Sequence, residues 1–534
     1  MGKLLGQIRT MGMLPWLVLA LLVAMVFTPA AAFADDGSDS SSSSTSLSSS
    51  TSLSSSSSNP FSSTRQTNKI SRDLNPKVFL STARVGMFSN VGPCLADGNM
   101  AFGEVQYIDV AADLEAALLA NKLDAILLDA GEYNQMVAQA RGELTTMSQS
   151  VGTVETGFMF GSNEIDGTYR EQFNDMVQSM QRDGSLTEMQ DTWFGDRMLP
   201  DSVDLSDLTG TNGTIVFAAL PAPPYIIVNG DTYSGYEIDL LHTFCKRYGY
   251  KLEIKPISWN GLISGLENGQ YDMGGGAIFL NSFSSPTATA SMSTYTCDLV
   301  VGIRSNEATG VDFLTGIKDR LHESIVEQDR YLSVLQGAGI TLLITFFSLL
   351  LGLALGLGLF VRVSHEKRLW RAIANGYTWF IRGMPAVLFL MIMYYVIFGR
   401  LNIDGIVVSI LAFGLMFGAS VYGMLRSGVS AVDIGQMQAA LALGYEPTKA
   451  FFKFVLPQAA RIILPEFKSE VVALIKNTAI VGCIAVVDLT KAGDIIRSNT
   501  FDAFIPLISC AVIYFILIEI VDRVIDLIAK KLQR

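Results

Sequence analysis

Long apolar runs dominate the C-terminal part of the chain. Five of them lie at about residues 338–361, 376–398, 405–425, 471–487 and 504–521. A bilayer core about 30 Å thick needs about 20 residues of helix, because each residue adds about 1.5 Å. Each run has this length or nearly so, and the pattern therefore predicts an all-α domain with five membrane-spanning helices.

The preceding part of the chain has shorter and more varied runs. Apolar stretches at residues 83–88, 123–128 and 214–219 alternate with amphipathic stretches such as 112–119 and 236–248. Alternating strand and helix patterns are typical of α/β folds. We therefore predict an α/β domain with a mostly parallel sheet.

Between these two parts, residues 311–336 are charged and amphipathic. The apolar positions with helical spacing are Phe313, Leu314, Ile317, Leu321 and Ile325. Such a pattern predicts a helix that lies along the outer membrane surface, and a simple connecting helix is the alternative.

The first 34 residues have the features of a secretory signal peptide. Lys3 and Arg9 flank the start, an apolar run covers residues 13–27, and Ala-Phe-Ala at 32–34 is a small-x-small cleavage site. An uncleaved membrane anchor is the alternative, although the run is shorter than a usual span. Both interpretations place the following segment outside the cytoplasm.

Residues 35–64 are mostly Ser and Thr. Such a segment cannot bury enough apolar area to offset the entropy lost on ordering. We expect a disordered tether there.

Charge divides the chain in the same way as hydropathy. The whole chain has 38 Lys and Arg against 50 Asp and Glu, a formal net charge of −12. Residues 1–34 contribute +2, residues 35–337 contribute −20 and residues 338–534 contribute +6. Without an overall cationic field, nucleic acid is an unfavourable partner.

Basic residues in the loops set the expected orientation. The connection after the first apolar run is basic, whereas the connection after the second holds little beyond Arg400 and Asp404. The basic residues of the first connection are Arg362, Lys367, Arg368 and Arg371. Basic loops stay in the cytoplasm, so we predict a multi-pass plasma-membrane protein with an extracytoplasmic α/β domain and a cytoplasmic C-terminus.

The connection between the third and fourth runs is long and is not a polar linker. Residues 435–444 form a short Ala-rich pattern that ends at Gly444, followed by a turn at Pro447. A second amphipathic pattern is bounded by Pro457 and Pro465. Small side chains let a helix enter a partner's groove closely, and an amphipathic segment without a partner is the alternative.

Motifs in and around this connection resemble the membrane subunits of polar amino acid ABC importers of the histidine and glutamine permease type. The matching positions are Gln438, Ala439, Ala440, Gly444, Leu456 and Pro457, together with Gly339-Ile-Thr-Leu, Arg382-Gly-Met-Pro385 and Leu474-Ile-Lys-Asn-Thr478-Ala. The resemblance covers nearly all of residues 335–534 and implies a type I ABC importer transmembrane domain.

In that family the connection docks into a separate ABC ATP-binding subunit, and the permease forms two-fold dimers. The resemblance therefore implies an ATPase partner and a permease dimer, expected to be a homodimer. The ATPase-coupling loop comprises Gly435, Gln438, Ala439, Ala440, Gly444, Leu456 and Pro457. Gln438 departs from the family, which has Glu there, and so removes a carboxylate that would pair with the ATPase.

The α/β part resembles the periplasmic-type solute-binding proteins that feed these permeases. Residues 222–225, 235–240, 259–266 and 269–272 resemble the first lobe. Residues 83–87, 116–124, 173–184 and 193–195 resemble the second lobe and its closing helix. The resemblance implies one complete two-lobed domain with swapped lobe order: 65–205 second lobe, 206–310 first lobe, 311–336 connector and 337–534 transmembrane domain.

The same resemblance suggests the solute contacts. Asp129 matches the family's acceptor for the amino group, and Tyr225 and Trp259 match the aromatic walls of the cleft, with ordinary core or surface positions as alternatives. Ser284, near Asn281, stands where the family has the Arg that holds the α-carboxylate. The missing Arg and the acidity of this part favour a neutral or cationic solute.

Three positions in the apolar part are candidates for the transport pathway. They are Arg382, Lys476 and Thr478. Lys476 lies in the fourth apolar run, where a charge is costly and indicates function, although snorkelling to the inner surface explains it equally well.

A catalytic centre is not predicted. The only Gly-Lys dipeptide is at residues 2–3, so the chain has no phosphate loop and any ATP is used by a partner subunit. The histidines are isolated in sequence and the five cysteines form no C-x-x-C pair, so we expect neither a metal site nor a directly bound cofactor.

The leading interpretation is a fused receptor and permease of an ABC importer for a small polar solute, an amino acid. A ligand-gated channel is one alternative, because glutamate receptors also join such lobes to a pore. A non-transporting membrane sensor with a degenerate cleft is the other, because of the missing Arg.

Overall fold

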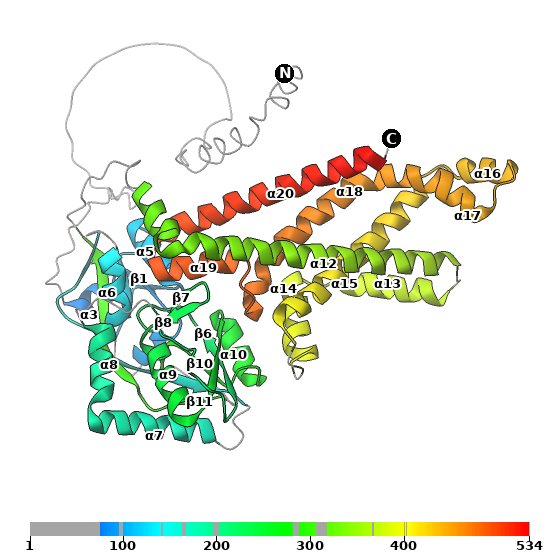
Figure 1. Cartoon of the computed structure of the whole chain (residues 1–534). Coiled ribbons are helices and arrows are strands. Elements are labelled where there is room, and N and C mark those ends of the chain that lie inside the picture. Colours follow the sequence, from blue (N-terminus) through cyan, green and yellow to red (C-terminus); the bar gives the residue numbers. More distant parts are fainter. Residues whose placement is uncertain are drawn as a thin grey trace, which may run out of the picture. The chain divides into compact units, whose positions relative to one another are not determined.

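The computed structural model describes most of the chain from residue 75 onward (Figure 1). The described residues are 75–95, 100–139, 143–162, 167–195, 202–280, 288–305, 318–365, 368–399, 401 and 403–532. The predicted signal peptide, the Ser-rich tether, Asn281 and Ser284 lie outside these residues.

One sheet of ten strands forms the α/β domain. Its order is β2-β1-β3-β12-β5-β10-β6-β9, with β4 paired to β12 and β11 paired to β5. The strands are β1 (Arg84–Met87), β2 (Glu104–Tyr107), β3 (Ala125–Asp129), β4 (Leu144–Thr146), β5 (Gly152–Phe160), β6 (Thr214–Ala219), β9 (Lys251–Pro256), β10 (Met273–Phe279), β11 (Thr289–Ala290) and β12 (Tyr295–Arg304). A separate hairpin pairs β7 (Ile227–Asn229) with β8 (Thr232–Ser234).

The sheet has two parallel parts joined by two crossing strands. β2-β1-β3 are parallel in one part, and β9-β6-β10 are parallel in the other. β12 runs antiparallel to β3, β5 runs antiparallel to β10, and the two crossing strands pair with each other from Thr156↔Tyr295 to Gly152↔Leu299. The prediction of a mostly parallel sheet therefore holds within each part, and the crossing strands make the whole sheet mixed because the chain passes twice between the parts.

We call the part built on β1–β3 the N-lobe and the part built on β6, β9 and β10 the C-lobe. Each lobe receives one crossing strand from the other segment of the chain, so residues 75–195 are not an independent two-lobed domain. The chain enters the C-lobe in β5, before residue 205, because Phe173 of α7 and Trp193 of α8 pack with Phe217 of β6 in one core.

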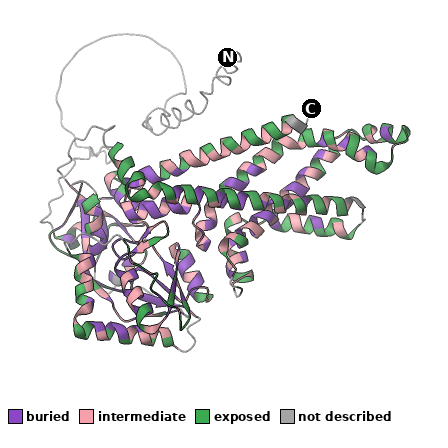
Figure 2. Ribbon diagram, viewed as in Figure 1, coloured by how far each residue is buried: buried purple, intermediate pink, exposed green. Residues whose placement is uncertain are grey.

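Helices cover both lobes. In the N-lobe they are α3 (Pro76–Leu80), α4 (Val91–Leu95), α5 (Ala111–Leu119) and α6 (Ala130–Gln139). In the C-lobe they are α7 (Thr168–Asp183), α8 (Ser185–Phe194), α9 (Tyr236–Tyr248) and α10 (Trp259–Glu267). The strands lie inside and the helices present their outer faces to solvent (Figure 2). Cys245 and Cys297 are buried free thiols.

The remaining residues form a helical domain. Its main helices are α12 (Arg330–His365), α13 (Leu369–Arg382), α14 (Ala386–Met391), α15 (Gly405–Ser430), α16 (Ile434–Ala442), α17 (Pro447–Ala450), α18 (Leu456–Asn477), α19 (Leu489–Thr500) and α20 (Phe504–Leu532). Short π or 3-10 segments adjoin them: η4 (His322–Val326), η5 (Glu327–Asp329), η6 (Ile392–Ile397), η7 (Phe451–Val455) and η8 (Thr478–Ile484).

Three described helices are long and apolar enough to cross a membrane, and the number rises to five if two bent pairs each count as one span. One pair, Leu369–Arg382 with Ala386–Ile397, bends by 108°. The other, Pro447–Ile484 with Leu489–Thr500, bends by 51°. The second and fourth predicted spans are therefore broken rather than straight; in the first pair Pro385 lies at the bend, where it disfavours helical backbone at the preceding residue.

Two predicted boundaries differ in the structure. The helix α12 begins at Arg330, so the end of the predicted connector belongs to the first long helix, after left-handed backbone at Gln328 and Asp329. The second amphipathic pattern and the fourth apolar run are continuous in α18, which contains Pro465 in its interior. Pro465 therefore does not end the helix, because the residues on both sides of it keep helical backbone.

Small residues let α12 and α15 approach closely. A Cβ on Gly352 would lie 2.8 Å from the side chain of Phe417, and one on Gly356 would lie 2.6 Å from Val421. On the other helix, a Cβ on Gly414 would lie 2.5 Å from Leu351. Glycines four residues apart are the usual way for membrane helices to gain close contact, and these positions fix the packing of the first and third apolar runs.

Candidate functional site

A cavity of about 300 Å³ lies where the two lobes meet. Its N-lobe wall consists of Phe88, Asn90, Asp109, Val110, Ala111 and Glu132. Its C-lobe wall consists of Leu220, Pro221, Ala222, Ile257, Ser258, Trp259, Asn260, Gly276 and Ala277. The last three lining residues, Lys491, Asp494 and Ser498, come from α19 of the helical domain. We call this cavity the cleft.

Carboxylates give the N-lobe wall its charge. Asp109 accepts a hydrogen bond of 3.0 Å from the backbone N–H of Ser89. Glu132, at the first turn of α6, is 3% exposed, and its Oε2 atom has no hydrogen-bond partner. Burial raises the pKa of Glu132 well above its usual range, and the neighbouring Asp129 raises it further.

A carboxylate behind the C-lobe wall fixes the backbone of that wall. Glu237 accepts hydrogen bonds from the N–H groups of Gly276 (2.7 Å) and Ala277 (3.0 Å). Both residues have left-handed backbone, with φ of 122° and 54°, at the irregularity of β10. Burial raises the pKa of Glu237 to about 8, although the two N–H donors lower it.

Two helices begin at the cleft without a side-chain cap. The N-cap positions are Val110 for α5 and Ser258 for α10, and neither side chain makes a capping hydrogen bond. The first N–H groups that bond back within these helices belong to Asp113 and Leu262. The first turns therefore present free N–H groups and the positive ends of two helix dipoles, which favour an anion.

The α19 residues at the cleft share one helix face, because Lys491, Asp494 and Ser498 are spaced by three and four residues. Lys491 is 7% exposed; its ammonium group makes no hydrogen bond or ion pair among the described residues, and the charges that act on it are Asp494 and Asp488. Its methylene groups lie 3.3–3.6 Å from the position of a Cβ on Gly482.

The residues predicted from the sequence have different positions around the cleft. Trp259 lines it, at the start of α10. Asp129 and Tyr225 are fully buried and are not among its lining residues; the Tyr225 hydroxyl donates to Asp129 Oδ1 over 2.9 Å. The same oxygen accepts the Glu132 N–H over 3.0 Å, so this pair supports the helix that carries Glu132.

Sequence reasoning did not identify Glu132, Lys491 or Asp494. Glu132 follows Asp129 by three residues; both are buried, and only Glu132 is among the residues that line the cleft. Nothing in the sequence linked Lys491 to a cleft formed by residues more than 200 positions earlier in the chain.

Both lobes make direct contact with α19. The Arg497 guanidinium forms an ion pair of 2.7 Å with Asp113 of α5, and Gln139 of α6 donates to the Asn499 carbonyl over 3.3 Å. On the other side, the Asn499 side chain donates to the Val228 carbonyl of β7. Apolar side chains repeat this arrangement, since Ile495 lies in the C-lobe core and Phe501 in the core around α5 and α6.

The C-lobe also contacts the broken segments of the helical domain. The Tyr395 hydroxyl of η6 donates to the Cys483 carbonyl of η8 over 2.8 Å, and it lies 3.4 Å from the Gly261 carbonyl of α10. Gln270 donates to the Tyr394 carbonyl over 3.0 Å. Segments beside both bends of the helical domain therefore touch the C-lobe.

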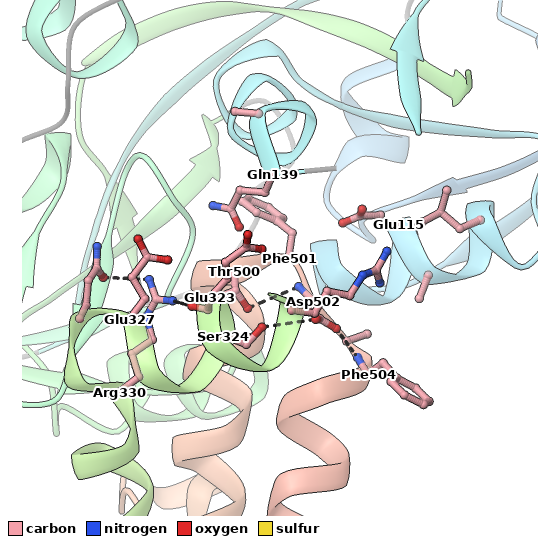
Figure 3. A pocket seen from close by; sticks show the side chains of 16 residues that line it. Glu115, Gln139, Glu323, Ser324, Glu327, Arg330, Thr500, Phe501, Asp502 and Phe504 are labelled. Carbon is pink, nitrogen blue, oxygen red and sulfur yellow. Dashed lines mark hydrogen bonds between the residues drawn. The ribbon is translucent and has the colours of Figure 1, made fainter. Parts of the chain in front are cut away.

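A second cavity, of about 430 Å³, lies between the N-lobe, the connector and the turn before α20 (Figure 3). Ser324 donates to Asp502 over 3.3 Å, and Arg330 donates to the Glu323 carbonyl over 2.7 Å. Burial raises the pKa of Glu115 to about 8, and Arg320 partly opposes this rise. This cavity is a charged junction between the two domains.

The predicted ATPase-coupling loop is largely exposed. Of α16, only Ala440 is buried, while Gln438 and Ala439 are exposed. Gly444 ends this part with a φ of 85°, as a helix C-terminus that uses glycine does. Pro457 is exposed and Leu456 is half-buried at the start of α18.

The three pathway candidates are not brought together. Arg382 is exposed at the end of α13, with its guanidinium against Gly423 of α15. Lys476 is exposed on α18 and lines a groove in which Lys468 pairs with Asp522 and Asp526, each at 2.9 Å. Thr478 is buried and donates to the Ile475 carbonyl over 2.7 Å.

Comparison with known proteins assigns both domains. The model of the family described as binding-protein-dependent transport system inner membrane component matches residues 348–534. A putative glutamine transport system permease protein of Rickettsia felis is 31% identical over 208 residues, which are 38% of this chain and 94% of that protein. The chain belongs to this permease family. It is therefore an integral inner membrane protein.

A further relative and a solved structure are also similar to this chain. The arginine transport system permease protein ArtQ of Bacillus subtilis is 34% identical over 38% of this chain and 92% of its own length. A crystal structure of an amino acid ABC transporter with histidines is 29% identical, with a TM-score of 0.36, over 42% of this chain and all of that one.

The α/β domain matches a second family. The model described as bacterial extracellular solute-binding proteins, family 3, covers residues 215–313. The chain thus joins an α/β solute-binding domain to a helical permease domain. Among the described residues, no group of three or more His, Cys, Asp and Glu is placed to hold a metal ion.

Proposed function

We propose that the chain is the combined solute-binding and permease subunit of an ATP-driven ABC importer for amino acids. The observation that carries this proposal is the cleft: its walls come from the solute-binding domain, and its remaining side comes from α19 of the permease domain. A solute that leaves the lobes would meet the permease directly, without a diffusing receptor.

Energy would come from a separate ATP-binding subunit. The exposed α16 and the residue that follows it offer an apolar surface to such a partner, since Ile434 is 74% and Leu443 77% exposed. Relatives in this family are transport system permease proteins, and two permease units, expected to be identical, would supply two coupling loops. The solute-binding domain and α19 would then lie outside the cytoplasm, and α16 inside.

The solute class follows from the cleft and from the relatives. Relatives are described as glutamine, arginine and histidine/lysine/arginine/ornithine transport system permeases. The cleft is lined by three carboxylates, Asp109, Glu132 and Asp494, and by one cation, Lys491. These carboxyl groups favour neutral or cationic amino acids over acidic ones, because a cationic group of the ligand would stabilise their charged forms whereas an added carboxylate would be repelled.

Among the residues predicted from the sequence, Trp259 would contact the solute. Asp129 and Tyr225 would support the wall from beneath, through the hydrogen bond to Glu132. Asn281 and Ser284, and the swapped order of the lobes, stay predictions drawn from the family resemblance.

The test is reconstitution of the full chain with its ATP-binding subunit in liposomes. We expect uptake of radiolabelled L-glutamine or L-arginine that requires ATP and is abolished by a hydrolysis-deficient ATPase. Passive currents on solute addition would instead support the channel, and solute binding without uptake would support the sensor; either result would overturn the importer.

A further inference from the structure

Three features of the cleft point to a ligand that carries both charges. Lys491 is a buried cation at the cleft; no hydrogen bond or ion pair of its ammonium group is present among the described residues, and the charges that act on it are Asp494 and Asp488. A buried carboxylate, Glu132, has an oxygen without a hydrogen-bond partner. The uncapped first turns of α5 and α10 contribute free N–H groups beside them.

We propose that Lys491 of the permease domain holds the α-carboxylate of the bound amino acid in a cleft shared by both domains. The proposal rests on the proposed function and goes beyond it, because it assigns to α19 a part of the binding site. The solute-binding domain alone would be an incomplete site.

The carboxylate subsite combines one charge with two dipoles. Lys491 supplies an ammonium group, a compact donor of three hydrogen bonds, and the first turns of α5 and α10 supply backbone N–H groups. Removing a charged side chain from water without a partner is unfavourable, so a buried lysine at a cavity is stabilised when an anion arrives. This arrangement provides the cationic side chain that is missing among the lining residues of the C-lobe wall.

The ammonium subsite lies on the other wall. Glu132 Oε2 is available to accept a hydrogen bond, and Asp109 and Asp494 line the same cavity. A ligand with a carboxylate and an ammonium group on one carbon would meet Lys491 with the first group and Glu132 with the second. The ligand class is therefore an α-amino acid, not an amine or an organic acid alone.

Shared binding makes α19 sensitive to the ligand. Both lobes contact α19 through Arg497 and Asn499, so a lobe that closes on the ligand pulls on this helix. The preceding segment η8 connects α19 to α18, which belongs to the other half of the broken fourth span. A ligand bound to Lys491 would thus shift the conformational equilibrium of the permease domain at the bend before α19.

The test compares ligands that differ in the carboxylate only. Full-length protein in lipid nanodiscs is titrated by calorimetry with L-arginine and L-argininamide, and with L-glutamine and L-glutaminamide. The variants are Lys491→Met, the conservative Lys491→Arg, and Lys251→Met as a matched control on the outside of the C-lobe.

We expect the wild type and the control to prefer an amino acid to its amide by at least about tenfold, as a charge-assisted contact requires. Lys491→Met should lose this preference while keeping its affinity for the amide, and Lys491→Arg should restore it. A preference that persists in Lys491→Met, or an equal loss for acid and amide, would overturn the proposal. If the wild type binds none of the four compounds, the amino acid function itself fails.

Discussion

Two short helices flank α18 in the permease domain, and their surroundings are opposite. In α19, eight of twelve residues are buried, among both lobes and neighbouring helices. In α16, one of nine is buried; Ile434 and Leu441 are exposed, as is Leu443 directly after the helix. The comparison shows that α19 packs against other parts of the same chain, whereas α16 is exposed, as the proposed docking of a separate ATP-binding subunit requires.

The fused receptor explains this difference. A permease that relies on a diffusing receptor must leave its outer surface free for docking and release. Here the equivalent surface is occupied by ion pairs and apolar contacts from the same chain, and tethering raises the effective concentration of the receptor. The predictions below test the two helices separately.

The largest effect is expected at the exposed helix. Ala439→Arg places a long charged side chain where close approach to a groove requires a small one, so ATP-driven uptake should fall by about 100-fold or more. Ala439→Ser, which stays small, is the matched control. The measurement is uptake in proteoliposomes with the ATP-binding subunit.

Solute binding should be unchanged in Ala439→Arg, because α16 has no contact with the cleft. Uptake at the wild-type rate in this variant would show that α16 is not the coupling surface.

A smaller effect is expected at the junction of α19 with the N-lobe. Arg497 is 9% exposed and pairs with Asp113, which is 39% exposed. Because one partner is partly hydrated, the coupling free energy in a double-mutant cycle of Arg497→Met and Asp113→Asn should be about 1–2 kcal/mol. The measurement is denaturant or thermal unfolding of the full chain in detergent. A coupling near zero would mean that this pair does not hold the domains together.

The smallest effect concerns pH. Glu115 has a folded-state pKa of about 8, above its unfolded value of about 4.5. The folded protein then retains a proton that the unfolded chain has lost, so stability should decrease as pH rises from about 4.5 to about 8. Arg320, Asp502 and Glu143 are the charged groups that influence it.

Glu115→Gln should flatten this part of the pH profile of the melting temperature. Glu155→Gln, at an exposed position on β5, should leave the profile unchanged. An unaltered slope in Glu115→Gln would contradict the assignment.

Much of the fold was predictable, because periodicity and motif residues are local. The apolar runs located the permease helices, and the strand runs at residues 83–88 and 214–219 became β1 and β6. The break at Pro385 and the continuous α18 were not predicted, because they depend on packing against other helices and not on the apolar run alone.

The candidate site was less predictable. Trp259 begins a helix at the cleft and lines it, whereas Asp129 and Tyr225 are buried behind the lining residues. Lys491 was counted only as one charge of the basic part. Its position depends on docking between two domains, which sequence spacing does not encode.

Hydrogen exchange of the full chain in nanodiscs tests the central claim most directly, with mass spectrometry before and after addition of L-arginine or L-glutamine. If the cleft is shared, the backbone amides of α19, residues 489–500, should gain protection together with those of the first turns of α5 and α10. Protection confined to the two lobes, with α19 unchanged, would show that the permease domain takes no part in binding the solute.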